Sequence, residues 1–207
     1  MKRLFLTILI LLFCSTVYAD SEGPNSPGTM ADDDTVGTTT WTNPDNAKTS
    51  DNSYASATSP SHRIWRYSHY LKATNFGFAI PVGATINGIV VEIEKKSDDD
   101  IGGDLTIDSE VKIVKSDSTI GAENKASGDD WPLSDTYSTY GAFDDLWNES
   151  WSAEDINNAN FGIVLSTKWY EEDIHAYVDH IRITVYYTEV PSVTILYNAV
   201  IENAVIN

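Results

Sequence analysis

The chain has 207 residues, of which 31 are acidic and 13 are basic, and its formal net charge at pH 7 is -18. Because phosphate binding needs clusters of Lys and Arg, this balance argues against nucleic acid as a partner. The only cysteine is Cys14, so the chain beyond it has neither a disulfide framework nor a thiol nucleophile and must rely on a packed core.

Residues 1–19 have the pattern of a cleaved secretory signal. Lys2 and Arg3 give a positive start, an apolar stretch covers 4–13, and Val-Tyr-Ala at 17–19 is a small-residue cleavage site. The apolar stretch is too short to span a bilayer and no later segment is apolar enough, so we expect no membrane insertion of the mature chain. This segment predicts a secreted protein, located extracellularly or at the cell surface.

Composition divides the rest of the chain into three regions. Residues 20–34 are rich in Ser, Gly, Pro and Asp, which predicts a flexible acidic leader. From 35 to 188, short β-prone runs alternate with turn residues, as expected of a single β-sandwich domain. Residues 189–207 form an apolar, β-prone C-terminal tail.

The best strand candidates are runs in which apolar and polar side chains alternate, because such a run buries one face. In one of them, Ile181, Ile183 and Val185 alternate with Arg182 and Thr184. The four clear runs cover residues 89–93, 107–113, 161–165 and 181–187, and weaker candidates cover 35–41, 54–57 and 70–79. Together they approach the number of strands in a β-sandwich.

One short helix is predicted near residue 152. Ser152 can cap the first turn and Asp155 can reach back to it, which is the spacing of a capping box. No long run of apolar residues has a 3.6-residue period. The predicted fold is therefore all-β, a jelly-roll-like antiparallel β-sandwich with one short connecting helix.

Two blocks of sequence carry a resemblance to a known group of proteins. The first, at 73–93, includes Asn-Phe-Gly-Phe at 75–78, and the second, at 140–181, includes Asp-Leu-Trp at 145–147 and Ala-Tyr-Val-Asp-His-Ile at 176–181. They resemble mostly uncharacterised β-sandwich modules of bacteria and tailed phages, taken to be surface or virion-appendage proteins. Over roughly 35–188, the resemblance implies an extracellular jelly roll with a structural or adhesive role, and it supplies no catalytic residues.

Acidic loops suggest calcium as the one cofactor to consider, although none is required. Asp98, Asp100 and Asp104 lie in one acidic, glycine-containing loop and are the best candidate ligands. No cluster follows the Asp-x-Asp-x-Asp-Gly pattern of a calcium loop, so solvated turns are the alternative. The spacing of the histidines does not predict a zinc site.

The aromatic content raises the possibility of glycan binding. Trp131 and Trp169 lie outside the clear alternating faces, and exposed Trp rings stack well against sugars. The alternative is that these rings fill the core, as most Trp side chains do. We take the two residues as candidate ligand-binding positions.

The tail has the character of a segment that pairs with a sheet edge. It contains a five-residue near-repeat at 198–207, with pairs of β-branched residues and few charges. The candidate residues for self-association are Val193, Ile195, Val200, Ile201, Val205 and Ile206. The alternative is that the tail folds back as an edge strand of its own domain.

These features favour binding over catalysis. No Gly-x-Ser-x-Gly elbow is present, and many paired carboxylates will fall by chance at the separation a glycosidase needs. The leading hypothesis is a secreted, non-catalytic module for surface assembly or adhesion, with no catalytic residues. The alternatives are a carbohydrate-binding module stabilised by calcium and a small glycan-active hydrolase.

Overall fold

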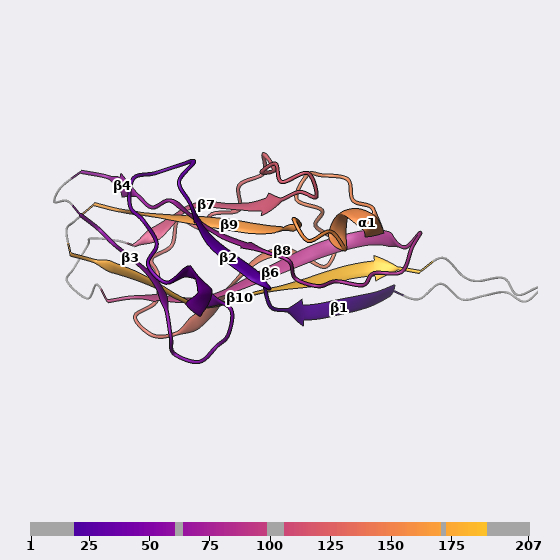
Figure 1. The fold of residues 1–207 in the computed structure, drawn as a ribbon, viewed down its shortest axis with the longest axis horizontal. Coiled ribbons are helices and arrows are strands. Elements are labelled where there is room, and N and C mark those ends of the chain that lie inside the picture. The colour runs from indigo at the N-terminus through magenta and orange to yellow at the C-terminus, as the bar shows by residue number, and fades with distance from the viewer. Residues whose placement is uncertain (1–18, 61–63, 99–105, 171–172, 190–207) are drawn as a thin grey trace, which may run out of the picture.

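The computed structural model describes residues 19–60, 64–98, 106–170 and 173–189, which form two five-stranded antiparallel sheets (Figure 1). Sheet A contains β1 (Ala19–Asn25), β3 (Ala55–Thr58), β6 (Thr85–Ser97), β8 (Thr136–Ala142) and β10 (His175–Thr188). Sheet B contains β2 (Thr29–Asp33), β4 (Arg66–Tyr67), β5 (Tyr70–Thr74), β7 (Ile107–Val114) and β9 (Gly162–Trp169). A 3-10 turn, η1 (Pro44–Ala47), and a one-turn helix, α1 (Ala153–Ile156), connect strands.

The order of the strands is that of a jelly roll. Along the chain, successive strands alternate between the sheets, except that β4 and β5 both lie in sheet B and both pair with β9. In sheet A, β10 lies between β6 and an edge formed by β1 and β3, and β8 closes the other side. The predicted fold class, an all-β antiparallel sandwich, is confirmed.

The core lies between the sheets and follows the predicted alternation. In the long β6–β10 pair, Val91 opposes Ile183 and Ile93 opposes Ile181, and all four side chains are buried. Sheet B contributes the corresponding faces of β7 and β9. Because period-two alternation places one set of side chains on one face, the buried face of each of these strands could be read from the sequence.

The prediction of a flexible leader at 20–34 is wrong, because this segment forms most of β1 and all of β2. β1 pairs with β10, and β2 pairs with β5. Met30 enters the core, and the Asp32 carboxylate accepts a hydrogen bond from the backbone N–H of Trp41, at 2.7 Å, and faces Nδ1 of His69, at 2.9 Å. Backbone pairing with β10 and β5 orders a segment whose composition alone suggests disorder.

Other expectations were met in part. Residues 54–57 and 70–79 overlap β3 and β5, whereas 35–41 forms no strand and contributes only an isolated bridge at Thr39. The helix at α1 has the predicted capping box, with Ser152 and Asp155 bonded reciprocally. Among the described residues, no helix is long and apolar enough to cross a membrane.

His180 follows a β-bulge in β10 and is held at both ring nitrogens. The Ser26 hydroxyl lies 2.8 Å from Nε2, and the Tyr137 hydroxyl lies 2.8 Å from Nδ1. Burial, followed by the charge of Arg182, lowers the pKa of His180 below its usual value of 6.5. The folded protein therefore favours the neutral ring.

Mild acidification is expected to destabilise the fold through His180. The unfolded chain takes up this proton near pH 6.5 and the folded protein only at lower pH, so the stabilisation is complete above pH 6.5 and is lost as the pH falls below it. Urea unfolding at about pH 7.5 and about pH 5.5 should give a lower midpoint at the acidic pH. His180→Gln should reduce this difference, and an equal difference in both proteins would assign it to other groups.

Candidate functional site

Large apolar side chains are exposed together at one end of sheet B. We call this cluster the aromatic end, and it consists of Ile64, Trp65, Tyr67, Lys168 and Tyr170. Trp65 and Tyr67 are 44% and 42% exposed. The rings of Trp65 and Tyr170 are 5.4 Å apart and tilted by 58°, and the Lys168 ammonium lies 5.5 Å from the centre of the Trp65 ring. The arrangement offers two neighbouring rings with a cation beside them.

The register of β4 on β9 explains this exposure. Arg66 opposes Trp169, and Tyr67 opposes Lys168. Because neighbouring residues of a strand point to opposite faces, burial of Trp169 turns Lys168 and Tyr67 outward. Trp65, two residues before Tyr67, follows the same alternation and reaches the Lys168 ammonium.

The aromatic end lies far from the described ends of the chain. Ala19 pairs with Thr188, so the first and last strands of the described chain lie side by side at one end of the sandwich. β4 lies at the opposite end (Figure 1). The 14-residue strand β10 runs between these ends and spans roughly 45 Å.

The prediction that Trp131 and Trp169 form an exposed platform is wrong. Trp169 is fully buried and Trp131 is 4% exposed. Trp131 donates a hydrogen bond from Nε1 to Oδ1 of Asp108, at 2.8 Å, which satisfies its polar edge inside the protein. Both rings fill the core, the role that was the alternative for each.

Only one of the three calcium candidates, Asp98, lies in the described part of the chain. Asp98 is engaged by His175, whose backbone N–H and Nδ1 lie 2.8 and 2.7 Å from its two carboxylate oxygens. Asp100 and Asp104 lie outside the described residues. Among the residues that are described, no group of three or more His, Cys, Asp or Glu side chains could hold a metal ion.

Asp179 and His180, neighbours in β10, have structural contacts. The Asp179 carboxylate accepts hydrogen bonds from the backbone N–H groups of Asp51 and Asn52, at 3.2 and 3.1 Å. Burial raises the pKa of Asp179, and these two hydrogen bonds oppose that shift. Both ring nitrogens of His180 contact hydroxyl groups. Asp179 therefore holds the backbone of the loop at Asp51, His180 bonds to neighbouring side chains, and the two do not form a catalytic dyad.

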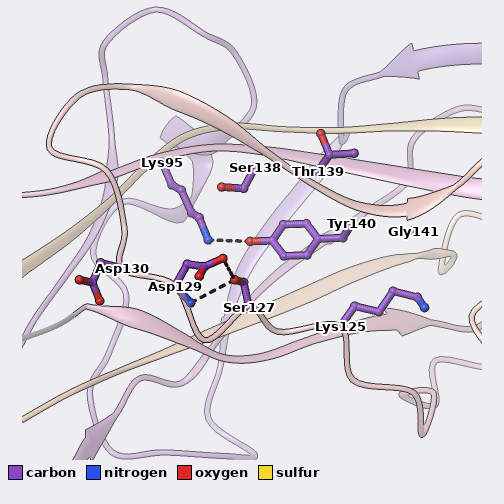
Figure 2. Close-up of a pocket in the computed structure, with 9 residues that line it drawn as sticks. All are labelled: Lys95, Lys125, Ser127, Asp129, Asp130, Ser138, Thr139, Tyr140 and Gly141. Atoms are coloured by element: carbon purple, nitrogen blue, oxygen red, sulfur yellow. Dashed lines mark hydrogen bonds between the residues drawn. The ribbon is translucent and has the colours of Figure 1, made fainter.

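A polar pocket of about 390 Å³ lies beside β8, between β6 and the segment 125–130. Figure 2 shows the Lys95 ammonium and the Tyr140 hydroxyl meeting in it, with Ser127 and Asp129 bonded to each other alongside. The Lys95 ammonium and the Tyr140 hydroxyl are 2.6 Å apart. The pocket therefore opens onto a buried amino group.

Asp108 completes a buried cluster with the Lys95 and Tyr140 groups. Its Oδ1 lies 2.5 Å from the Lys95 ammonium, and its Oδ2 accepts from the Tyr140 hydroxyl at 2.7 Å. Burial lowers the pKa of Lys95, against the opposing effect of Asp108, and raises the pKa of Tyr140. Lys95 continues the alternation of Ile89, Val91 and Ile93 beyond the predicted run, and no local pattern indicated its partner across the sandwich.

The remaining sequence candidates lie beyond the structural description. The six assembly residues between Val193 and Ile206 are outside the described residues, so self-association through the tail stays a prediction. The resemblance to bacterial and phage surface modules also stays a prediction. Comparison of the chain with protein-family models, curated proteins and solved structures finds no match in any of the three.

Proposed function

We propose that this protein is a secreted, non-catalytic β-sandwich module that acts in adhesion or surface assembly and binds carbohydrate through its aromatic end. The observation that carries the proposal is the exposed pair of rings at Trp65 and Tyr170, with Tyr67 and Lys168 beside them. Exposed clusters of large apolar side chains on a secreted domain mark places where another molecule binds.

Carbohydrate is the ligand class that this surface suits best. The faces of sugar rings carry C–H groups that pack on aromatic rings, while Tyr hydroxyls, the Trp N–H and an ammonium supply hydrogen bonds to sugar hydroxyls. Two rings held about 5 Å apart by packing lose little conformational entropy on binding. The aromatic end is thus a preorganised surface for a sugar or a short stretch of polysaccharide.

The position of the aromatic end supports a role in adhesion. A ligand there would lie roughly 45 Å from Ala19 and Thr188, at the other end of β10. Attachment of the protein at that far end would leave the aromatic end free. The proposed separation of binding from attachment is the arrangement that an adhesive module needs.

The contacts of the buried carboxylates support a non-catalytic role. Asp108 is bonded to Lys95, Tyr140 and Trp131 inside the sandwich, and Asp179 holds two backbone N–H groups. A general acid or nucleophile of a glycosidase must face the substrate across a cleft. These two carboxylates instead serve groups of their own chain.

A glycan array probed with the labelled mature protein tests the proposal. We expect binding to a defined set of glycans, and Trp65→Ala should weaken that binding at least tenfold, a change of about 1.4 kcal/mol. Because Trp65 is partly exposed and lies outside the hydrophobic core, the substitution should leave the melting temperature nearly unchanged.

Phe143→Ala is the matched control for this experiment. Phe143 is also an exposed aromatic residue, but it lies against Tyr186 near the opposite end of β10. Its removal should leave glycan binding intact. Absence of binding to any glycan, or binding that Trp65→Ala and Phe143→Ala affect equally, contradicts the proposal.

A further inference from the structure

Lys95 and Asp108 join the two sheets through a contact inside the sandwich. Lys95 lies in β6 of sheet A, and Asp108 lies in β7 of sheet B. Their side chains are 3% and 0% exposed, and Nζ lies 2.5 Å from Oδ1. This separation is shorter than the roughly 2.7–2.9 Å of an ordinary charge-assisted N–H···O hydrogen bond. The amine and the carboxyl group are thus in direct contact inside the sandwich.

Aromatic side chains enclose this pair. The Lys95 Nζ lies 4.6 Å from the centre of the Trp131 ring and 5.3 Å from that of Tyr140. Trp131 donates its N–H to Oδ1 of Asp108, and Tyr140 donates its hydroxyl to Oδ2. Oδ1 therefore accepts from the amine and from an indole, and Oδ2 accepts from a hydroxyl that also contacts the amine and, at 3.2 Å, from the backbone N–H of Ser127.

We propose that Lys95 and Asp108 condense to form an intramolecular isopeptide bond that links the two sheets covalently. The reacting groups are the side-chain amine of Lys95 and the side-chain carboxyl of Asp108, and the products are an amide and one water molecule. No oxidant, reductant or cofactor is consumed. The bond would act as a covalent brace in a domain whose chain beyond Cys14 contains no cysteine.

Burial favours the neutral, reactive form of the Lys95 amine. An ammonium and a carboxylate are costly to bury away from water, and a proton that passes from Lys95 through the Tyr140 hydroxyl to Oδ2 of Asp108 removes both charges. Burial lowers the pKa of Lys95, which agrees with this direction. The resulting amine has a free electron pair, and the resulting acid carries a leaving group.

The hydrogen bonds match the steps of the condensation. The Lys95 nitrogen attacks Cγ of Asp108, and negative charge develops on Oδ1, which the Trp131 N–H already contacts at 2.8 Å. The proton released by nitrogen passes to the Tyr140 hydroxyl, at 2.6 Å, while the hydroxyl proton of Tyr140 passes to Oδ2, at 2.7 Å. The Cγ–Oδ2 bond then breaks, and Oδ2 leaves as water.

The pocket gives the water a way out of the sandwich. Lys95 and Tyr140 both line it, and Figure 2 shows their polar atoms meeting at its wall. Tyr140 is in this scheme a catalytic residue, because its hydroxyl contacts both reacting groups. Trp131 is the second, since it holds the oxygen on which charge develops.

Mass spectrometry of the purified full-length protein, denatured and then digested, tests the proposal. We expect a branched peptide that joins the segments containing Lys95 and Asp108 and is lighter than their sum by one water molecule. Asp108→Asn should give the same linked peptide by release of ammonia in place of water. Tyr140→Phe should reduce the linked fraction several-fold while circular dichroism shows the sheet intact.

Lys95→Arg is the control, since it keeps the charge and removes the reactive amine. It should yield only unlinked peptides. If the folded wild-type protein also yields only unlinked peptides after prolonged incubation, Lys95 and Asp108 form an ion pair and nothing more, and the proposal is overturned. A linked fraction that is unchanged in Tyr140→Phe would overturn the proton relay.

Discussion

Deleting residues 20–34 from the protein is expected to lower its melting temperature by about 10 °C or more, since each kcal/mol is worth about 2–4 °C in a domain of this size. The deletion removes β1 from the edge of β10 and β2 from the edge of β5. It also removes Met30 from the core, a loss of about 1.5–3 kcal/mol. The Asp32 carboxylate, which accepts a hydrogen bond from the backbone N–H of Trp41 and faces His69, is lost as well.

A shorter deletion separates the two strands. β1 is largely exposed and makes mainly backbone contacts, whereas β2 carries Met30 and Asp32. Removing only 20–26 should therefore cost less than removing 20–34, although it leaves one edge of β10 open to pairing with other chains. Scanning calorimetry measures both deletions. A melting temperature that the longer deletion leaves unchanged would show that this segment contributes nothing to the fold.

Ile183→Asp is expected to unfold the protein. Ile183 is fully buried at the centre of the β6–β10 pair, opposite Val91. A carboxylate there has no partner, and burying it costs several kcal/mol against a typical total stability of about 5–15 kcal/mol. Circular dichroism and urea titration of the purified protein would show loss of the cooperative transition.

Arg182→Gln is the neighbouring control. Arg182 points to the outer face of sheet A, where its guanidinium forms a paired contact with Glu92 at 2.9 and 3.0 Å and stacks on Tyr137. Because this pair is partly exposed, its loss should cost about 1 kcal/mol or less. If Arg182→Gln were as damaging as Ile183→Asp, the assigned faces of β10 would be wrong.

Long alternating runs made the centre of this fold predictable. Ile181, Ile183 and Val185 share one face of a single strand because of its pleat, so local geometry was enough to group them as a buried set. The edge strands β1 and β2 could not be predicted in this way, because these segments are held in strand conformation by pairing with β10 and β5. The composition of a polar segment does not show whether a partner edge exists.

The candidate site was harder to predict, for the same reason. Trp169 continues the alternation of Phe161, Ile163 and Leu165, so extending that run would have predicted its burial. No such pattern distinguishes the buried ring of Trp131 from the exposed ring of Trp65. Trp65 is exposed because the two-residue strand β4 pairs with β9 in one register. The contact between Lys95 and Asp108 likewise crosses from one sheet to the other, and the alternation within a single strand predicts no such contact.

Hydroxyl-radical footprinting of the protein, with and without a glycan that it binds, tests the proposed function most directly. The method reports the exposure of individual aromatic side chains. Ligand should protect Trp65, Tyr67 and Tyr170 and leave Phe143 unchanged, because Phe143 lies near the other end of β10. Unchanged labelling of Trp65, with protection at Tyr140 beside the pocket instead, would contradict the assignment of the aromatic end as the binding site.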